Sequence, residues 1–276
     1  MWEALHFEFM RNALLAGILV SVSCGIIGTL VVVNRIVFIS GGIAHAAYGG
    51  IGVGFYTGIP PALGAAVFSF LSSMIMGVAS LKSRERVDAI IGVMWAVGMA
   101  IGIILIDLTP GYNVDLMSYL FGSILTVGER DIWFMVSLDL ITILIVLIFY
   151  KEFLAMSYDE EFSFVVGIPV KTLYFVLLGL IALSVVMIIR VVGLILVIAL
   201  ISIPPYIAEK YTRSLGKMMF VSTLLGMFFT IIGLWLSYSY NLTSGATIIM
   251  VAGLAFFVSL GIDFLGGPVK TPARSS

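Results

Sequence analysis

Charged side chains are scarce in this sequence. Asp, Glu, Lys and Arg make up 11% of its 276 residues, whereas 61% are hydrophobic and the mean hydropathy is +1.20. These values lie far outside the range of soluble domains. They predict an all-α polytopic membrane protein, in which helices satisfy their backbone hydrogen bonds within the bilayer.

Cysteine and histidine are also rare, and each scarcity excludes a class of site. The one cysteine, Cys24, cannot form an internal disulfide. The two histidines, His6 and His45, are too few for a His-rich catalytic metal site, and no Gly-x-Ser-x-Gly motif occurs. We therefore expect no catalytic residues, no permanently bound cofactor and no enzymatic activity in this chain.

Nucleotide- and nucleic-acid-binding signatures are missing as well. The sequence has no Gly-x-x-x-x-Gly-Lys-Ser/Thr loop, the backbone cradle that binds nucleotide phosphates. Any ATP that the protein uses must therefore be hydrolysed by another chain. The basic residues are scattered singly and form no stripe, so no nucleic acid is expected as a partner.

Long apolar runs dominate what remains. A span needs about 20 apolar residues to cross about 30 Å of hydrocarbon. The candidate spans 172–189 and 191–208 are separated by little more than Arg190. Pro204-Pro205 is expected to break the second of these two spans, so that one of them could be a half-span. The run 116–125 is too short to cross and is expected to be re-entrant or interfacial. Eight or nine transmembrane helices are thus predicted, from candidates at 10–33, 37–58, 61–81, 89–107, 132–150, 172–189, 191–208, 218–237 and 246–265.

The cations are distributed unevenly between the two sides of these spans. If the amino terminus lies outside, eleven of the 14 Lys and Arg residues fall on the inside, which favours an N-out, C-in orientation. Residues 1–267 are expected to form a single transmembrane domain, and 268–276 a polar disordered tail. The inside cations are Arg35, Lys82, Arg84, Arg86, Lys151, Lys171, Lys210, Arg213, Lys217, Lys270 and Arg274.

The largest inside loop, 150–169, is acidic and amphipathic. Ser157 is placed to cap a short helix whose first turn carries Asp159, Glu160 and Glu161, matched to the positive end of the helix dipole. Gly167 and a following proline end it. Its apolar side is suited to a groove on a partner protein. The alternative is an interfacial helix on the lipid headgroups, which its acidic residues disfavour because the inner leaflet is anionic.

Five ordered stretches resemble one family, the permease subunits of ATP-driven (ABC) importers for zinc, manganese and iron. The resemblance implies a homodimer in the prokaryotic cytoplasmic membrane, with the transport pathway at its interface. It also implies two ABC ATPase subunits inside, an extracytoplasmic solute-binding protein, and a coupling role for the acidic loop. The stretches are 40–50, 119–125, 158–169, 192–204 and 243–247.

The second predicted span carries the strongest candidate for the pathway. On a helix, His45 has Gly41, Gly42 and Gly49 on its face, which predicts room for an ion or water. Gly42 and Gly50 also belong to a small-residue stripe that favours close helix packing. A neutral imidazole suits zinc, manganese or iron(II), so we predict His45 as a metal ligand. Many members of the family that this chain resembles have a carboxylate where Gly41 stands.

Asp139, well inside the fifth span, is the best replacement for that carboxylate. An isolated carboxylate there costs about 3 kcal/mol unless a cation or a donor meets it. Contact with the metal and a hydrogen bond between helices are equally good interpretations. A proton-coupled secondary transporter, with His45 and Asp139 as its relay, is the alternative to an ATP-driven importer.

Overall fold

The computed structural model describes residues 6–82, 86–110, 122 and 124–266, and all regular structure in these residues is helical. The predicted all-α membrane fold is thereby confirmed. The predicted tail 268–276 and most of the run 116–125 lie outside the described residues. The elements are α1 (Glu8–Val33), α2 (Val37–Thr57), α3 (Pro61–Lys82), α4 (Val87–Asp107), η2 (Ile124–Thr126), α6 (Glu129–Ile148), α7 (Tyr150–Tyr158), α8 (Glu160–Val165), α9 (Val170–Val192), α10 (Leu194–Tyr211), α11 (Leu215–Tyr240) and α12 (Ser244–Gly266).

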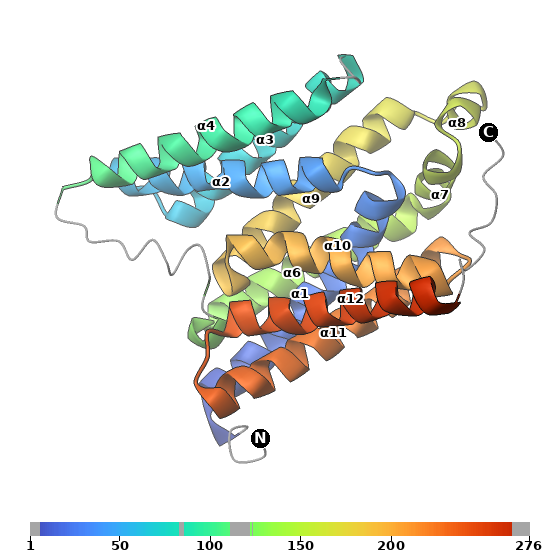
Figure 1. The fold of residues 1–276 in the computed structure, drawn as a ribbon. Coiled ribbons are helices and arrows are strands. Elements are labelled where there is room, and N and C mark those ends of the chain that lie inside the picture. Colours follow the sequence, from blue (N-terminus) through green and yellow to red (C-terminus); the bar gives the residue numbers. More distant parts are fainter. Residues whose placement is uncertain (1–5, 83–85, 111–121, 123, 267–276) are drawn as a thin grey trace.

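Eight of the described helices are long and apolar enough to cross a membrane. The exception among the long helices is α10, whose 18 residues include two prolines. At 1.5 Å per residue it is still about 27 Å long. Figure 1 shows α10 running back alongside the other helices, from the end of α9 toward α7 and α8. The described residues therefore fit the predicted eight or nine spans.

Both sequence-based expectations about α10 need correction. The break before it falls not at Arg190 but at Gly193, whose φ of +79° favours glycine. Pro204 and Pro205 also do not end the helix, which continues to Tyr211. The carbonyl of Ile201, which Pro205 leaves without its usual helical donor, packs directly against the backbone of Gly28 on α1. Pro205 therefore lies within the helix at a point of close contact with α1.

The helices form two groups that share α9. In Figure 1, α2, α3 and α4 lie together along the upper side, and α1, α10, α11 and α12 lie below. α9 packs on α2 and α3 of the first group and on α1 and α10 of the second. α6 packs mainly on α1. The second helix of the fold is thus held by α3, α4, α9 and α10.

Hydroxyl groups and glycines line the contact between α1 and α11. Ser21 Oγ lies 3.5 Å from Thr230 Oγ1, and Thr29 Oγ1 lies 3.3 Å from Ser222 Oγ. Each of the four hydroxyl-bearing side chains is buried. Small residues let helix backbones approach in a bilayer, where lipid offers no hydrophobic drive for helix association. This interface places α1 at the centre of the second group.

The acidic loop contains two short helices rather than one. Ser157 is not the cap that the sequence predicted, because it belongs to α7 and accepts a hydrogen bond from Asn34 Nδ2 at 3.0 Å. The cap of α8 is Asp159, whose Oδ1 accepts from the backbone N–H of Phe162 at 2.8 Å. Asp159 replaces Ser157 because α7 extends further than the pattern indicated.

Candidate functional site

His45 lies half-buried on α2 and faces α4. Its ring stacks on the indole of Trp95, with ring centroids 3.8 Å apart and planes 13° from parallel. Its Nδ1 lies 3.3 Å from the sulfur of Met99. The stack fixes the plane of the imidazole, and the sulfur lies at one of its two nitrogens. Sequence reasoning did not identify either neighbour, although their spacing of four residues places them on one face of a helix.

The space expected beside His45 is largely filled. A Cβ at Gly42 would overlap Ile91 and lie 3.2 Å from Met76, and one at Gly49 would lie 2.8 Å from the carbonyl oxygen of Gly98. Neighbouring helices occupy both positions, so the expectation of room there is wrong. Gly41 differs, because its nearest neighbour would be the terminal carbon of Ile198, at 3.4 Å. An ion would therefore have to approach His45 from another direction.

Gly50 marks the closest approach in the first group of helices. A Cβ there would overlap the backbone carbonyl of Gly64 on α3, and one at Gly52 would overlap the carbonyl of Gly102 on α4. Backbone atoms cannot yield as a flexible side chain can. These glycines let the backbone of α2 pack closely against α3 and α4, and this packing positions His45.

Asp139 is buried on α6, with an exposed fraction of 4%. The hydroxyl of Ser23 on α1 donates to its Oδ1. Its Oδ2 is buried and has no hydrogen-bond partner among the described residues. The contact with Ser23 is the hydrogen bond between helices that the sequence left open as an alternative to metal contact.

The structure does not bring His45 and Asp139 together. His45 contacts α4, whereas Asp139 contacts α1, and α2 and α6 do not pack along each other. Within the described part of the chain, no group of three or more His, Cys, Asp or Glu side chains is placed to hold a metal ion. The paired His and Asp site, and the proton relay built on the same two residues, therefore lack a common location.

The helix α8 exposes most of its apolar side chains. Phe162, Phe164 and Val165 are 62%, 69% and 82% exposed, while the capped first turn carries Glu160 and Glu161. Ile168 N–H donates to the carbonyl of Ser163 and Gly167 N–H to that of Phe164. With a φ of +91° at Gly167, this is a Schellman ending, and it stops the helix where the sequence predicted.

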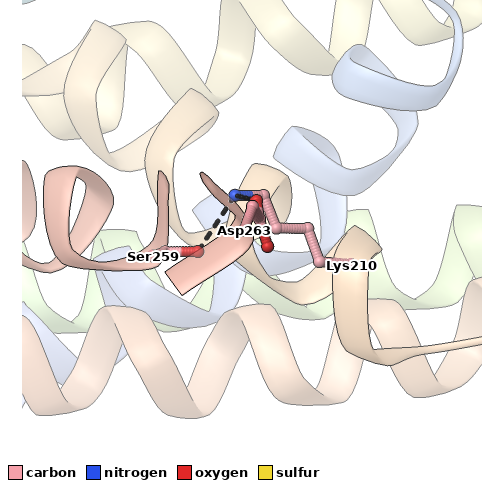
Figure 2. Close-up of polar contacts among 3 residues, drawn as sticks. All are labelled: Lys210, Ser259 and Asp263. Atoms are coloured by element: carbon pink, nitrogen blue, oxygen red, sulfur yellow. Dashed lines mark hydrogen bonds and ion pairs between the residues drawn. The ribbon is translucent and has the colours of Figure 1, made fainter. Parts of the chain in front are cut away.

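A polar cluster that sequence reasoning missed joins α10 to α12. Figure 2 shows Lys210 of α10 reaching Ser259 and Asp263 of α12. Lys210 Nζ donates to Asp263 Oδ2 and, at 3.1 Å, to Ser259 Oγ. The four-residue spacing of Ser259 and Asp263 on an otherwise apolar helix was the available signal. The cluster lies near the C-terminal ends of α10 and α12, on the side of the molecule where Figure 1 also shows α7 and α8.

The fold defines a multi-pass membrane protein, because eight of the described helices are long and apolar enough to cross a bilayer. The chain belongs to the ABC 3 transport family, whose model matches residues 6–263. It is 55% identical to a membrane protein of Synechocystis over 94% of this chain and 92% of the relative. It is 33% identical to the manganese transport system membrane protein MntC of Listeria monocytogenes, over 92% and 91%.

A solved structure agrees with these relatives. The chain matches PsaBC from Streptococcus pneumoniae in complex with Fab with a TM-score of 0.83 and 31% identity, covering 92% of this chain and 91% of that one. The resemblance inferred from the five sequence stretches is confirmed. The protein is therefore a multi-pass transport permease of the ABC 3 family, located in the bacterial inner membrane.

Proposed function

We propose that this chain is the permease subunit of an ATP-driven importer that moves manganese, zinc or iron(II) ions into the cytoplasm. A separate ABC ATPase supplies the energy, and an extracytoplasmic binding protein delivers the ion. The observation that carries the proposal is the family match over residues 6–263, together with relatives that are named for manganese transport. No resident cofactor is required, because the metal ion is the cargo.

The proposal includes two copies of the chain and an N-out, C-in orientation. The uneven distribution of cations supports this orientation, since it places the α7 and α8 end inside. The permease domain comprises residues 1–267. The pathway lies between the two copies and is opened alternately to each side, as in rigid-body transport mechanisms.

In this proposal α8 is the coupling helix that docks into the ATPase. Its support is the exposed apolar side of α8 beside its acidic first turn, a combination typical of a helix that inserts into a groove on a protein. Asp159, Glu160 and Glu161 would set the charge of the contact, and Gly167 would set the direction in which the chain leaves it.

His45 is the proposed pathway residue on α2. Its support is its partly exposed imidazole, a borderline ligand that suits transition metals. Metal contact by Asp139 stays a prediction, whereas its hydrogen bond with Ser23 supports a packing role. The relay alternative has no comparable support, because the two residues contact different helices.

Uptake by the assembled importer tests the proposal. The permease, its ATPase and its binding protein would be reconstituted in vesicles, and radioactive manganese and zinc counted inside with and without ATP. We expect accumulation that requires ATP and that falls in His45→Ala. Accumulation driven by a proton gradient without ATP would contradict the proposed energy source. Uptake of every metal unchanged in His45→Ala would contradict the role of that residue.

A further inference from the structure

Met99 and Trp95 enclose the imidazole of His45 from one face of α4. The sulfur of Met99 lies 3.3 Å from Nδ1, and Trp95 stacks on the ring one helical turn earlier. All three side chains are only partly buried. A nitrogen and a sulfur donor therefore lie side by side at a position that is not sealed inside the bundle.

Backbone packing holds this pair together. A Cβ at Gly98, the neighbour of Met99, would lie 2.8 Å from the Cα of Ala46, the neighbour of His45. Small residues thus bring α2 and α4 to backbone contact. This contact holds the two helices, and therefore the two residues that carry the donors, close together.

The chemistry of the pair differs from that of a carboxylate and histidine site. A thioether is a soft ligand and imidazole a borderline one, whereas manganese(II) prefers carboxylate and other oxygen ligands. Gly41, one helical turn before His45, carries no side-chain donor. The oxygen donor that would favour a hard ion is missing there, and a sulfur donor lies on the opposite helix.

We propose that His45 Nδ1 and Met99 Sδ are a donor pair for the transported ion and that this pair selects zinc(II) or iron(II) over manganese(II). The proposal rests on the pathway role of His45 given above and narrows the class of cargo. At a tetrahedral angle, zinc bonds of about 2.0 Å to an imidazole nitrogen and about 2.3 Å to a thiolate sulfur set two donors about 3.5 Å apart. The 3.3 Å between Nδ1 and Sδ is close to that separation.

This arrangement also defines the competing explanation. If Nδ1 carried a proton, it would donate to the sulfur, and Met99 would only orient the ring so that Nε2 bound the ion. An orienting residue affects the binding of every metal alike. A donor affects soft and borderline ions far more than hard ones, so selectivity separates the two roles.

Metal binding to the purified permease and ATPase complex, without the binding protein, provides the test. Zinc(II) and manganese(II) are titrated separately into wild type, Met99→Leu and His45→Ala. Met94→Leu is the matched control, because it is a methionine on another face of α4. We expect Met99→Leu to weaken zinc binding about tenfold or more and manganese binding less than about twofold. X-ray absorption at the zinc edge should show a sulfur neighbour in wild type and in Met94→Leu, and none in Met99→Leu.

The failures of the two proposals are distinguishable. The donor pair would be overturned if Met99→Leu weakened the binding of zinc and manganese equally or left zinc binding unchanged. It would also be overturned if the zinc spectrum of the wild type showed no sulfur neighbour. Each of these results would leave His45 in the pathway. Unchanged binding of both metals in His45→Ala would instead remove the pathway role on which the pair depends.

Discussion

Lys210 on α10 and Asp263 on α12 form an ion pair whose side chains are 13% and 26% exposed. The ammonium also donates to Ser259 and lies 4.9 Å from the ring centre of Tyr206. The second oxygen of Asp263 has no partner among the described residues. The pair is therefore the main polar link between these two helices in the described part of the chain.

Removing one partner of this pair should destabilise the protein. We expect Lys210→Met to cost about 2 kcal/mol, because a partly buried carboxylate then loses its charged donor. The double variant Lys210→Met with Asp263→Leu should recover most of the loss. Thermal unfolding in detergent, followed by tryptophan fluorescence, measures both. A double variant less stable than the single one would contradict this account.

Two glycines on α2 should differ strongly in how much stability the addition of one methyl group costs. Gly50→Ala would push a Cβ into the backbone carbonyl of Gly64, and we expect a loss of about 3 kcal/mol. Gly41→Ala meets only the end of the Ile198 side chain, so its effect should stay below about 1 kcal/mol. The same unfolding measurement compares them. Similar losses in both variants would show that backbone contact at Gly50 is not the cause.

The apolar side of α8 should matter for assembly and not for folding. Phe164 and Val165 are 69% and 82% exposed, so replacing both with serine should change stability by less than about 0.5 kcal/mol. Recovery of the ATPase with the tagged permease should fall by about tenfold or more, because a central apolar anchor is lost. Tyr240→Ser, with a side chain 70% exposed at the other end of the molecule, is the control. Full recovery of the ATPase by the double variant would refute docking at α8.

Asp139→Asn should leave both stability and uptake close to wild type. The amide oxygen can still accept from Ser23, and the amide nitrogen replaces the buried oxygen that lacks a partner. Asp139→Leu should be destabilising, since it leaves the hydroxyl of Ser23 without its acceptor. Stability in detergent and ATP-dependent metal uptake are the measurements. A stable Asp139→Asn variant that had lost uptake would instead establish contact with the metal.

The apolar runs predicted the spans closely, because length and hydropathy alone decide which segments enter a bilayer. The second and third candidates, 37–58 and 61–81, correspond to Val37–Thr57 and Pro61–Lys82. Helix ends were harder to predict where they depend on contacts distant in sequence. Ser157 looked like a cap, yet it bonds to Asn34, and Pro205 looked like a break, yet its helix continues against Gly28.

The sequence was enough to predict His45 and Asp139 as single site residues, but not the side chains that contact them. His45 was evident from its rarity, and Asp139 from its charge inside an apolar span. Which side chains meet them depends on how helices pack, and the period of one helix carries no information about its partner. For that reason the glycines on the face of His45 predicted an open space, which neighbouring helices in fact fill. For the same reason nothing distinguished Met99 from the other methionines, of which the sequence has 14 in all.

The hydrogen bond from Asn34 to Ser157 gives the short helices α7 and α8 a second attachment to the bundle. The short segment 166–169 joins α8 to α9, while α7, one residue before α8, is tied to the end of α1. If a partner displaces α8, as proposed above, the movement would reach α2 and α3 through α9 and would reach α11 through α1.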